Sequence, residues 1–384
     1  MTMPTIYFDN NASTPMDPQV REAMLPFFDQ WYANPASVHG PGEAARNGIE
    51  TAREQVAGLL GCEPNRIIFN SGGTEANNTA ILSALRANPA KRHIVSSVVE
   101  HGSVLVPLEY WAGEGYTVEL LEVDAEGRLD LAALRAAIRP DTALVSLMAA
   151  NNETGVLWPV GEIAAICRER GVLYHCDAIQ LAGKGELDAA SLDADYLTIA
   201  GHKLHGPKGV GALYARRTAP ISSLVMGADQ ETGHRAGTEN VAGIVGLGHA
   251  CEIAAGLGEE DHQRVAGLRD RLEAGLLAQI PETRINGAGA PRLVNTCNIS
   301  FRHASSAGLI QDLDAMSIAV SAHAACQSGD LDPSHVLRAM AVPEEYLHGT
   351  LRISLSRFNT QGEVDRLLAV LPGLVARSRQ GFAV

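Results

Sequence analysis

Aromatic and charged residues are scarce in this chain of 384 residues. Phe, Trp and Tyr together make up 5% of it and charged residues 19%, whereas hydrophobic residues reach 46% and there are 38 glycines. A chain of this length can bury a large core, and this composition excludes a disordered protein. It is typical of a packed α/β enzyme, and the length predicts one large domain with a smaller companion.

A paired-cysteine motif, a long apolar run and an excess of positive charge are also missing. The six cysteines form no CxxC pair, so we expect reduced thiols and neither a disulfide framework nor a zinc site. No run of about 18 apolar residues occurs, and the first residues lack the pattern of a secretion signal, so we expect a cytoplasmic protein. The net charge of −14 argues against nucleic-acid or anionic-membrane partners, and any anionic ligand needs a local pocket.

Short apolar runs alternate with helical patterns between residues 66 and 215. The strand-like runs are RIIF, HIVSSVV, YTVELLEV, ALVSLMA, GVLYHCD, DYLTIA and GVGALYA. This alternation predicts a mainly parallel sheet covered by helices. Two helices are predicted before it: one begins at Asp17-Pro18 and carries an apolar stripe as far as Trp31, and another runs from about Gly42 to Leu60 and ends at Gly61.

The composition changes near residue 258, where a charged helix begins. Its apolar side carries Val265, Leu268, Leu272, Leu276 and Ile280. Beyond it, apolar residues alternate within 297–301 and within 351–355, which predicts strands with one face exposed to solvent or to a site. These patterns indicate a domain boundary and a C-terminal α+β unit.

Polar residues follow several of the predicted strands, at the ends where ligands of open α/β sheets gather. Asp177 and Gln180 follow one strand, and His202 with Lys203 follow the next. An aspartate there can hold a protonated ring nitrogen and a lysine can bond covalently to an aldehyde, which is the pair that a pyridoxal cofactor requires. Either residue alone is more readily explained by a surface ion pair.

Four other segments allow a functional and a structural interpretation. The strand–turn–helix in SGGTEANN offers N–H groups suited to a phosphate, although such turns also use glycine for backbone reasons alone. His101 is either an acid–base group or a satisfied polar residue, and MGADQETGHRAGTENV is either a functional or a surface loop. Cys326 lies in the small, polar stretch AVSAHAACQSGDLDPSHVL, which is typical of a reactive thiol, with His323 either assisting it or a bystander.

Ten strings of the chain, taken in order, resemble the cysteine desulfurases, and most closely their nitrogen-fixation, NifS-type branch. They are DNNASTP, NPASVHGPGEAAR, SGGTEANN, VVEHGSV, NNETG, DAIQ, GHKLHGPKGVG, RAGTEN, AACQSGDLDPSHV and LRISLSRF. The resemblance spans nearly the whole chain and implies a homodimer of the class-V aminotransferase superfamily. The implied fold is α/β, the pyridoxal-phosphate-dependent transferase fold type I, which is aspartate-aminotransferase-like. Residues 16–257 would form the large cofactor domain, and 1–15 with 258–384 the small α+β domain, carrying a mobile cysteine loop at about 321–332.

The resemblance also implies a set of site residues. The implied catalytic residues are Lys203, His101 and Cys326. Pyridoxal 5′-phosphate would be bound by Gly73, Thr74, His101, Asn152, Asp177, Gln180, Ala200, His202, Lys203 and Thr238. The substrate would be bound by Asn10, Asn152 and Arg352.

Individual roles carry over in the same way. Lys203 would hold the cofactor covalently, Asp177 would pair with the ring nitrogen, Gln180 would bond the phenolic oxygen and His101 would stack over the ring. The phosphate would be held at the Gly-Gly-Thr turn and at the segment before Lys203, with Thr238 reaching it from the partner subunit.

The reaction implied is the removal of sulfur from L-cysteine. The thiolate of Cys326 would attack the substrate sulfur, leaving L-alanine and a persulfide that passes to an acceptor such as a scaffold for iron–sulfur assembly. No metal is expected in the cofactor site, and transient iron–sulfur ligation by Cys326 is the one metal contact allowed. The strand period independently points Arg352 away from the core face, where its guanidinium suits a carboxylate.

The chain departs from the family pattern at three places. Around the cysteine the family usually has Gly-Ser-Ala before it and Thr after it, and this chain has His323, Ala324, Ala325 and Gln327. Ala200 stands where many relatives have a serine at the phosphate, which removes one hydrogen bond of roughly 1 kcal/mol. Ala228-Asp229 stands where the nearest relatives tend to have Gly-His, and nothing in the sequence explains that change.

Two alternatives stay open at this point. One is another pyridoxal-phosphate reaction, such as selenocysteine lysis or transamination, because cofactor residues alone do not set the outcome. The other is a non-catalytic paralogue that carries sulfur or binds a scaffold. Cys326 has no use in transamination, and the intact Lys203, Asp177, His101 and Arg352 argue against the paralogue.

Overall fold

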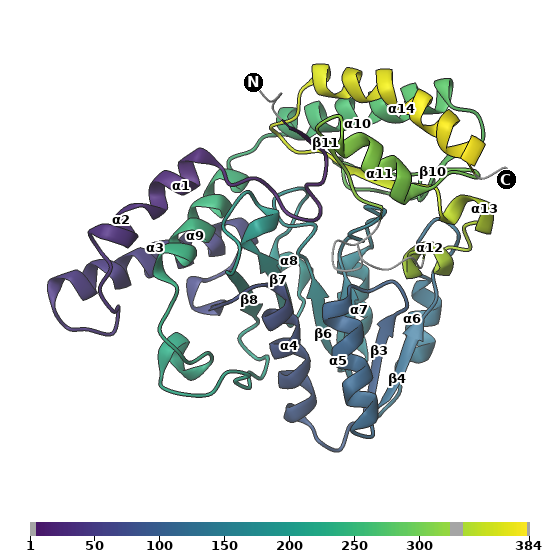
Figure 1. Cartoon of the computed structure of the whole chain (residues 1–384). Helices are drawn as coiled ribbons and strands as arrows, with labels where there is room; N and C mark the ends of the chain where they lie inside the picture. The colour runs from purple at the N-terminus through teal and green to yellow at the C-terminus, as the bar shows by residue number, and fades with distance from the viewer. Residues whose placement is uncertain (1–4, 323–332, 382–384) are drawn as a thin grey trace.

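A seven-stranded sheet lies at the centre of the larger part of the molecule (Figure 1). The computed structural model describes residues 5–322 and 333–381. The strands are β2 (Ile67–Asn70), β3 (His93–Ser97), β4 (Thr117–Leu121), β5 (Thr142–Met148), β6 (Leu173–Asp177), β7 (Tyr196–Ala200) and β8 (Gly211–Ala215). Their order is β2-β8-β7-β6-β5-β3-β4, and only β8 runs antiparallel to its neighbours. The predicted α/β class, the mainly parallel sheet and all seven predicted strands are confirmed.

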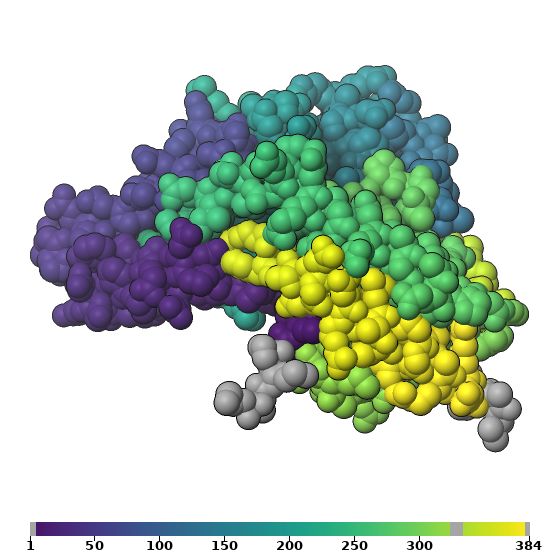
Figure 2. Space-filling model, turned by 90° about the horizontal axis from the view of Figure 1, so that it is seen from above, coloured from purple at the N-terminus to yellow at the C-terminus, as the bar shows by residue number. Residues whose placement is uncertain are grey.

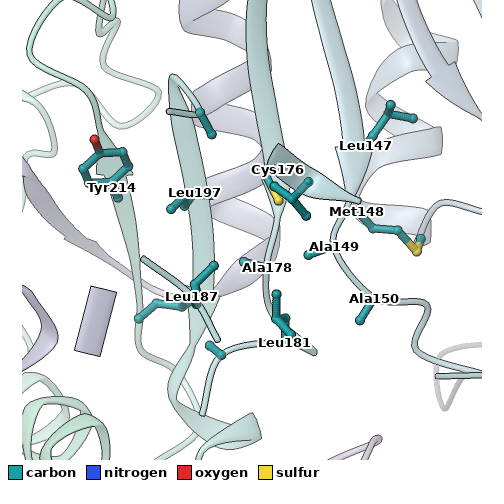
Figure 3. Packing of buried hydrophobic residues seen from close by; sticks show 14 of the residues in the cluster. Leu147, Met148, Ala149, Ala150, Cys176, Ala178, Leu181, Leu187, Leu197 and Tyr214 are labelled. Atoms are coloured by element: carbon teal, nitrogen blue, oxygen red, sulfur yellow. The ribbon is translucent and has the colours of Figure 1, made fainter. Parts of the chain in front are cut away.

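Most strands of this sheet are rich in apolar residues and buried on both faces, whereas the edge strand β4 is partly exposed. Leu147, Cys176, Leu197 and Tyr214 are register partners across β5, β6, β7 and β8, so their side chains lie in one row. Figure 3 shows this row within the larger hydrophobic cluster. Burial on two faces replaces the polar–apolar alternation of a solvent-exposed sheet with continuous hydrophobic runs.

Helices cover both faces of the sheet, with α4 and α5 on one face and α7 on the other (Figure 1). The helices of this part are α1 (Pro18–Met24), α2 (Pro26–Asp29), α3 (Gly40–Leu60), α4 (Gly73–Ala87), α5 (Gly102–Gly113), α6 (Leu131–Ala137), α7 (Val160–Glu169), α8 (Ala189–Leu192) and α9 (Val241–Ala255). The 3₁₀ turns are η1 (Pro64–Arg66), η2 (Gly201–Lys203) and η3 (Gln230–Gly233).

The first predicted helix is divided in two. Asp17 caps α1 as predicted, its carboxylate accepting the Gln19 N–H at 2.8 Å. The helix ends at Met24, and α2 begins at Pro26, whose missing N–H interrupts the hydrogen-bond ladder. The second predicted helix forms as α3 and ends at Gly61, which takes the left-handed conformation with φ 62° that glycine adopts without strain.

A second hydrophobic core lies in the C-terminal part of the chain. Its elements are α10 (Glu259–Gln279), β9 (Thr283–Ile285), β10 (Thr296–Phe301), α11 (Ser306–Asp314), β11 (Ile318–Ala319), β12 (Thr350–Ser354) and α14 (Gln361–Gly381). Two short helices of the same part of the chain, α12 (His335–Ala339) and α13 (Glu344–Leu347), pack their buried residues into the first core instead. A three-stranded antiparallel sheet of order β12-β10-β9 lies under α10 and α14, which pack side by side (Figure 2). Phe8 of the N-terminal segment is fully buried in the second core, and β1 (Ile6–Tyr7) pairs with β11. We propose the division into 16–257 and 1–15 with 258–384 on this basis.

The two faces of β10 and β12 differ in polarity as predicted, but neither face is exposed to solvent. Cys297, Ile299 and Phe301 point into the second core. The alternate residues are polar and buried, and Asn298 Nδ2 donates to the carbonyl of Glu153 at 3.2 Å. The polar face of this small sheet therefore covers the loops of the large one.

No single helix within residues 5–322 and 333–381 is long and apolar enough to cross a membrane. The pair α9 and α10 has the required length and composition only when both are taken together, and the two helices meet at 87°.

Val104 and Val106 of α5 provide a matched test of this packing. Val104 is fully buried against the sheet, and Val106 is 64% exposed. We expect Val104→Ala to lower the free energy of unfolding by about 2 kcal/mol, since it removes packed methyl groups. Val106→Ala should change it by less than about 0.5 kcal/mol. Denaturant titration followed by circular dichroism measures both, and equal effects would contradict the orientation of α5.

Candidate active site

A cavity of about 270 Å³ lies at the carboxyl ends of the parallel strands. Met148, Asp177 and Ala200 are the last residues of β5, β6 and β7, and all three line it. Loops that follow adjacent parallel strands converge at one edge of the sheet, which is why distant segments meet here. The predicted residues that line this cavity are Gly73, Thr74, His101, Asn152, Asp177, Gln180, Ala200, His202, Lys203 and Arg352.

A buried hydrogen-bond network holds Asp177. Asn77 Nδ2 donates to Asp177 Oδ2 at 2.8 Å and to Ser103 Oγ at 2.9 Å, and Asn77 Oδ1 lies 3.1 Å from His175 Nε2. Burial lowers the pKa of His175 to about 4, so its ring is neutral at physiological pH. Because the amide of Asn77 donates twice, its oxygen accepts from the His175 N–H, and inverting the amide would break all three bonds. The network presents a fixed carboxylate at the cavity.

His101 caps the start of α5 and faces the same cavity. The Ser103 N–H donates to His101 Nδ1 at 3.1 Å, which leaves the ring proton on Nε2. Burial lowers the pKa of His101 against the opposing charge of Asp177, and the positive charge of Lys203 adds to the lowering. The ring is therefore a neutral, oriented imidazole at physiological pH.

Lys203 ends the turn η2 directly after β7. Its Nζ donates to the backbone carbonyls of Asn11, at close range, and Ala12, at 2.9 Å. Both carbonyls belong to the N-terminal segment that passes between the two cores. Two neutral backbone carbonyls thus hold the amine at the cavity wall.

Gln180 joins this arrangement through its side-chain amide. Its Nε2 donates to the Asn11 carbonyl at 2.9 Å, and its Oε1 accepts from Lys184 Nζ at 2.8 Å. The amide is 4% exposed and bridges two lysines, Lys184 through its oxygen and Lys203 through the shared Asn11 carbonyl. Its nitrogen is consequently the end that can serve a ligand.

The start of α4 forms one end of the cavity, at Gly73 and Thr74. A side chain at Gly73 would collide with Ile179, since a Cβ there would lie 2.2 Å from Ile179 Cδ1. The helix start provides N–H groups without intrahelical partners and a positive dipole end, which together attract an anion. His202 lies alongside, and burial with the nearby lysines lowers its pKa to about 4.

Arg352 reaches the cavity from β12 of the C-terminal sheet. It is 1% exposed; Nη2 pairs with Asp9 Oδ1 at 2.8 Å and Nη1 donates to the Asn152 carbonyl at 3.2 Å. Its Nε is buried and has no hydrogen-bond partner in the described part of the chain. Such a donor suits an anionic ligand that enters the cavity.

Three predicted residues lie elsewhere. Asn10 is 1% exposed but lies behind the cavity wall, where its Nδ2 donates to the Ser354 carbonyl at 2.8 Å, and its neighbour Asn11 lines the cavity instead. Thr238 is exposed at the surface and does not line this cavity. The family resemblance implies that it reaches the phosphate in the cavity of the partner subunit. Cys326 lies outside the described residues.

The sequence assigned no role to several residues that shape the site: Asn11, Asn77, Ser103, His175 and Lys184. Strand alternation places His175 on the same side of β6 as Asp177, and helical spacing places Asn77 one turn after Gly73. These two periodicities could have identified His175 and Asn77 as site residues from the sequence. The part played by the Asn11 carbonyl has no sequence signature, because every residue has one.

A larger depression of about 950 Å³ lies on another part of the surface, around the ion pair of Arg53 with Glu231. It contains none of the predicted catalytic, cofactor or substrate residues, so volume alone does not identify the site. Ala228 and Asp229 lie at its edge, and nothing in their contacts explains their departure from the family pattern. Among the residues the structure describes, no group of three or more His, Cys, Asp or Glu side chains is placed to hold a metal ion.

Comparison with known proteins agrees with this geometry. The family model of the class-V aminotransferases matches residues 6–367. The chain belongs to this family, among its cysteine desulfurases. It is 47% identical over 377 residues to a cysteine desulfurase of Trichormus azollae, covering 98% of this chain and 94% of that one. It is 46% identical over 378 residues to the cysteine desulfurase NifS of Azotobacter vinelandii, with the same coverage. A solved NifS-like protein superposes with a TM-score of 0.91 at 37% identity, over 97% of this chain and 100% of the other.

Glu100, next to His101, gives this site a testable pH dependence. Burial raises the pKa of Glu100 to about 8 from its ordinary 4.5. Ser97 Oγ and the Met148 N–H donate to the same carboxylate oxygen, and these two hydrogen bonds lower the pKa by less than burial raises it. Between these two pH values the folded state binds more protons than the unfolded state, so this group lowers stability as pH rises.

We expect wild type to lose on the order of 2 kcal/mol more stability than Glu100→Gln between pH 5 and pH 8. Glutamine fits because its oxygen can keep both bonds while its nitrogen takes the place of the other carboxylate oxygen, which has no partner among the described residues. Denaturant midpoints across this range measure the difference. Parallel pH profiles for the two proteins would show that Glu100 does not retain its proton.

Proposed function

We propose that this cysteine desulfurase binds pyridoxal 5′-phosphate in the cavity around Lys203 and converts L-cysteine to L-alanine, with transfer of the sulfane sulfur to Cys326. The observation that carries the proposal is the convergence of an amine, a fixed carboxylate, a neutral imidazole and a helix start on one cavity. The family implies this cofactor, and a cysteine substrate follows from the names of the relatives.

The residues present fit the cofactor. The space at Gly73 exists only because no Cβ is there, and the adjoining start of α4 suits a phosphate. Asp177, fixed by Asn77, can keep a ring nitrogen protonated, and Gln180 Nε2 can donate to the phenolic oxygen. Ala200 removes one hydroxyl donor from the phosphate end without obstructing it.

The bound cofactor supplies an electron sink that makes the α-proton of the amino acid acidic. Lys203 Nζ would be the base that takes this proton. His101, neutral and held by Ser103, lines the same cavity and could move a proton through Nε2.

Arg352 and Asn152 would hold the substrate carboxylate. The guanidinium is already oriented by Asp9 and by the Asn152 carbonyl, so little side-chain freedom is lost on binding. Its buried Nε has no other partner in the described residues and can complete a charge-assisted hydrogen bond.

Cys326 is the proposed nucleophile, because the other cysteines are unsuited to the step. None of the five described cysteines lines the cavity, and burial raises the pKa of each, to about 12 for Cys62 and Cys167. A thiolate is required for attack. The thiolate of Cys326 would bond to the substrate sulfur as the carbon–sulfur bond breaks, giving a persulfide, and the carbon left behind would take a proton to give L-alanine.

The proposal extends to the partners. We propose a homodimer in which Thr238 of one subunit reaches the phosphate of the other, and an acceptor protein, such as an iron–sulfur scaffold, that takes the sulfur from Cys326. The relative NifS supports a link with nitrogen fixation.

A paired assay of sulfide and alanine released from L-cysteine with a thiol reductant tests the function. Wild type should make both products in equal amounts. Cys326→Ala should retain the cofactor absorbance and lose about 100-fold or more in activity, since the sulfur acceptor is gone. Cys62→Ala is the matched control and should keep full activity.

Cofactor absorbance without sulfide release, or full activity in Cys326→Ala, would contradict the proposed reaction. A strong preference for selenocysteine over cysteine would identify a selenocysteine lyase. A wild-type protein that binds no cofactor would indicate the non-catalytic paralogue.

A further inference from the structure

The segment 226–241, for which the sequence allowed a functional or a surface role, is attached to both sides of the connection from β2 to α4. On the strand side, the Phe69 N–H donates to Glu231 Oε2 at 2.8 Å. On the helix side, Arg235 Nε donates to Glu75 Oε1 at 2.9 Å. The segment therefore bridges the turn that forms the phosphate end of the proposed site.

Glu75 faces this phosphate end. An open cavity of about 430 Å³ adjoins the cofactor cavity, and Gly73, Thr74 and His202 line both. Glu75 and Lys208 line the open cavity only, and Glu75 is the one carboxylate among the described residues that line it. An ionised carboxylate at this place repels the anion that the helix start attracts, and it offsets the charge of Lys208.

The carboxylate of Glu75 is ionised and has two partners. Burial alone would raise the pKa of Glu75, but hydrogen bonds from Arg235 and Ser71 outweigh burial and hold it below its ordinary value. The Ser71 N–H donates to Oε2 at 2.9 Å, so it orients the carboxylate but brings no net charge. The charge is neutralised by Arg235. Because the Glu75 side chain is only 10% exposed, water would screen little of the charge left without that partner.

Arg235 itself lines neither cavity. Its guanidinium is directed at Glu75, with Nε 2.9 Å from Oε1 and Nη2 3.4 Å from Oε2. Arg235 therefore acts on a ligand at the phosphate end by cancelling the charge of Glu75, and not by contact.

We propose that Arg235 is a positioning residue for the phosphate of the cofactor: it neutralises the Glu75 carboxylate beside the start of α4, so that this end of the cavity accepts a dianion. The inference rests on the proposed function, because it concerns the phosphate end of the same site. It gives the segment 226–241 a role within its own subunit, in addition to the role in the partner that the resemblance implies for Thr238.

Charge substitutions at the pair separate neutralisation from a purely structural role. Arg235→Met leaves Glu75 without its cation, Glu75→Gln removes the negative charge while its oxygen can keep the Ser71 N–H, and the double variant removes both charges. Arg86→Met, in the last turn of α4, is the control. The readout is the dissociation constant of pyridoxal 5′-phosphate at low salt and slightly alkaline pH, compared with that of pyridoxal, which lacks the phosphate.

The two single variants should shift the affinity in opposite directions. We expect Arg235→Met to weaken binding of pyridoxal 5′-phosphate about 10-fold, Glu75→Gln to strengthen it about 3-fold, and the double variant to stay within about 3-fold of wild type. Pyridoxal affinity in each variant, and both affinities in Arg86→Met, should change less than about 2-fold. A pair with a structural role alone would weaken binding in both single variants and for both ligands, and that result would overturn the inference.

Inorganic phosphate tests the inference without the cofactor. Calorimetric titration of cofactor-free protein should give the same order of affinity, with Glu75→Gln tightest and Arg235→Met weakest. Equal phosphate binding in wild type and Arg235→Met, including none in either, would overturn the inference whatever the cofactor does. The expected order in a protein that shows no cofactor absorbance would instead contradict the proposed function alone.

Discussion

The backbone carbonyl of Asn11 is the contact on which the rest of the site depends. It accepts from Lys203 Nζ and from Gln180 Nε2, while the Asn11 side chain donates to Thr296 Oγ1 at 2.9 Å and to the Asn152 carbonyl at 3.3 Å. One residue therefore joins the loops of the large sheet to the polar face of the small one. The N-terminal segment can serve this purpose because Phe8 anchors it in the second core.

Positive charge is concentrated around the cavity of a protein whose net charge is −14. Lys203 and Arg352 line the cavity, Lys184 lies behind its wall, and Arg352 is paired with Asp9. The sequence predicts that an anionic ligand needs a local pocket, and this is where such a pocket lies.

The sequence predicts the parts of this site that follow from strand period and strand ends, and it fails where tertiary contacts decide. Asp177, His101 and Lys203 follow apolar runs that predict strands of a mainly parallel sheet, so their convergence is predictable. The hydrogen bond between Asn77 and Asp177 joins residues 100 positions apart, so it cannot be predicted from local sequence patterns. For the fold, the same contrast appears at Pro26, where an apolar stripe predicts one helix and the missing N–H divides it.

Reduction of the holoenzyme with borohydride, followed by digestion and peptide mass mapping, shows whether the cavity around Lys203 holds the cofactor. The treatment makes the bond between a lysine and an aldehyde permanent, and the chain offers only Lys91, Lys184, Lys203 and Lys208. The account predicts the added mass on Lys203 alone. Label on Lys184 or Lys208, or protein with the cofactor absorbance but no labelled lysine, would contradict it.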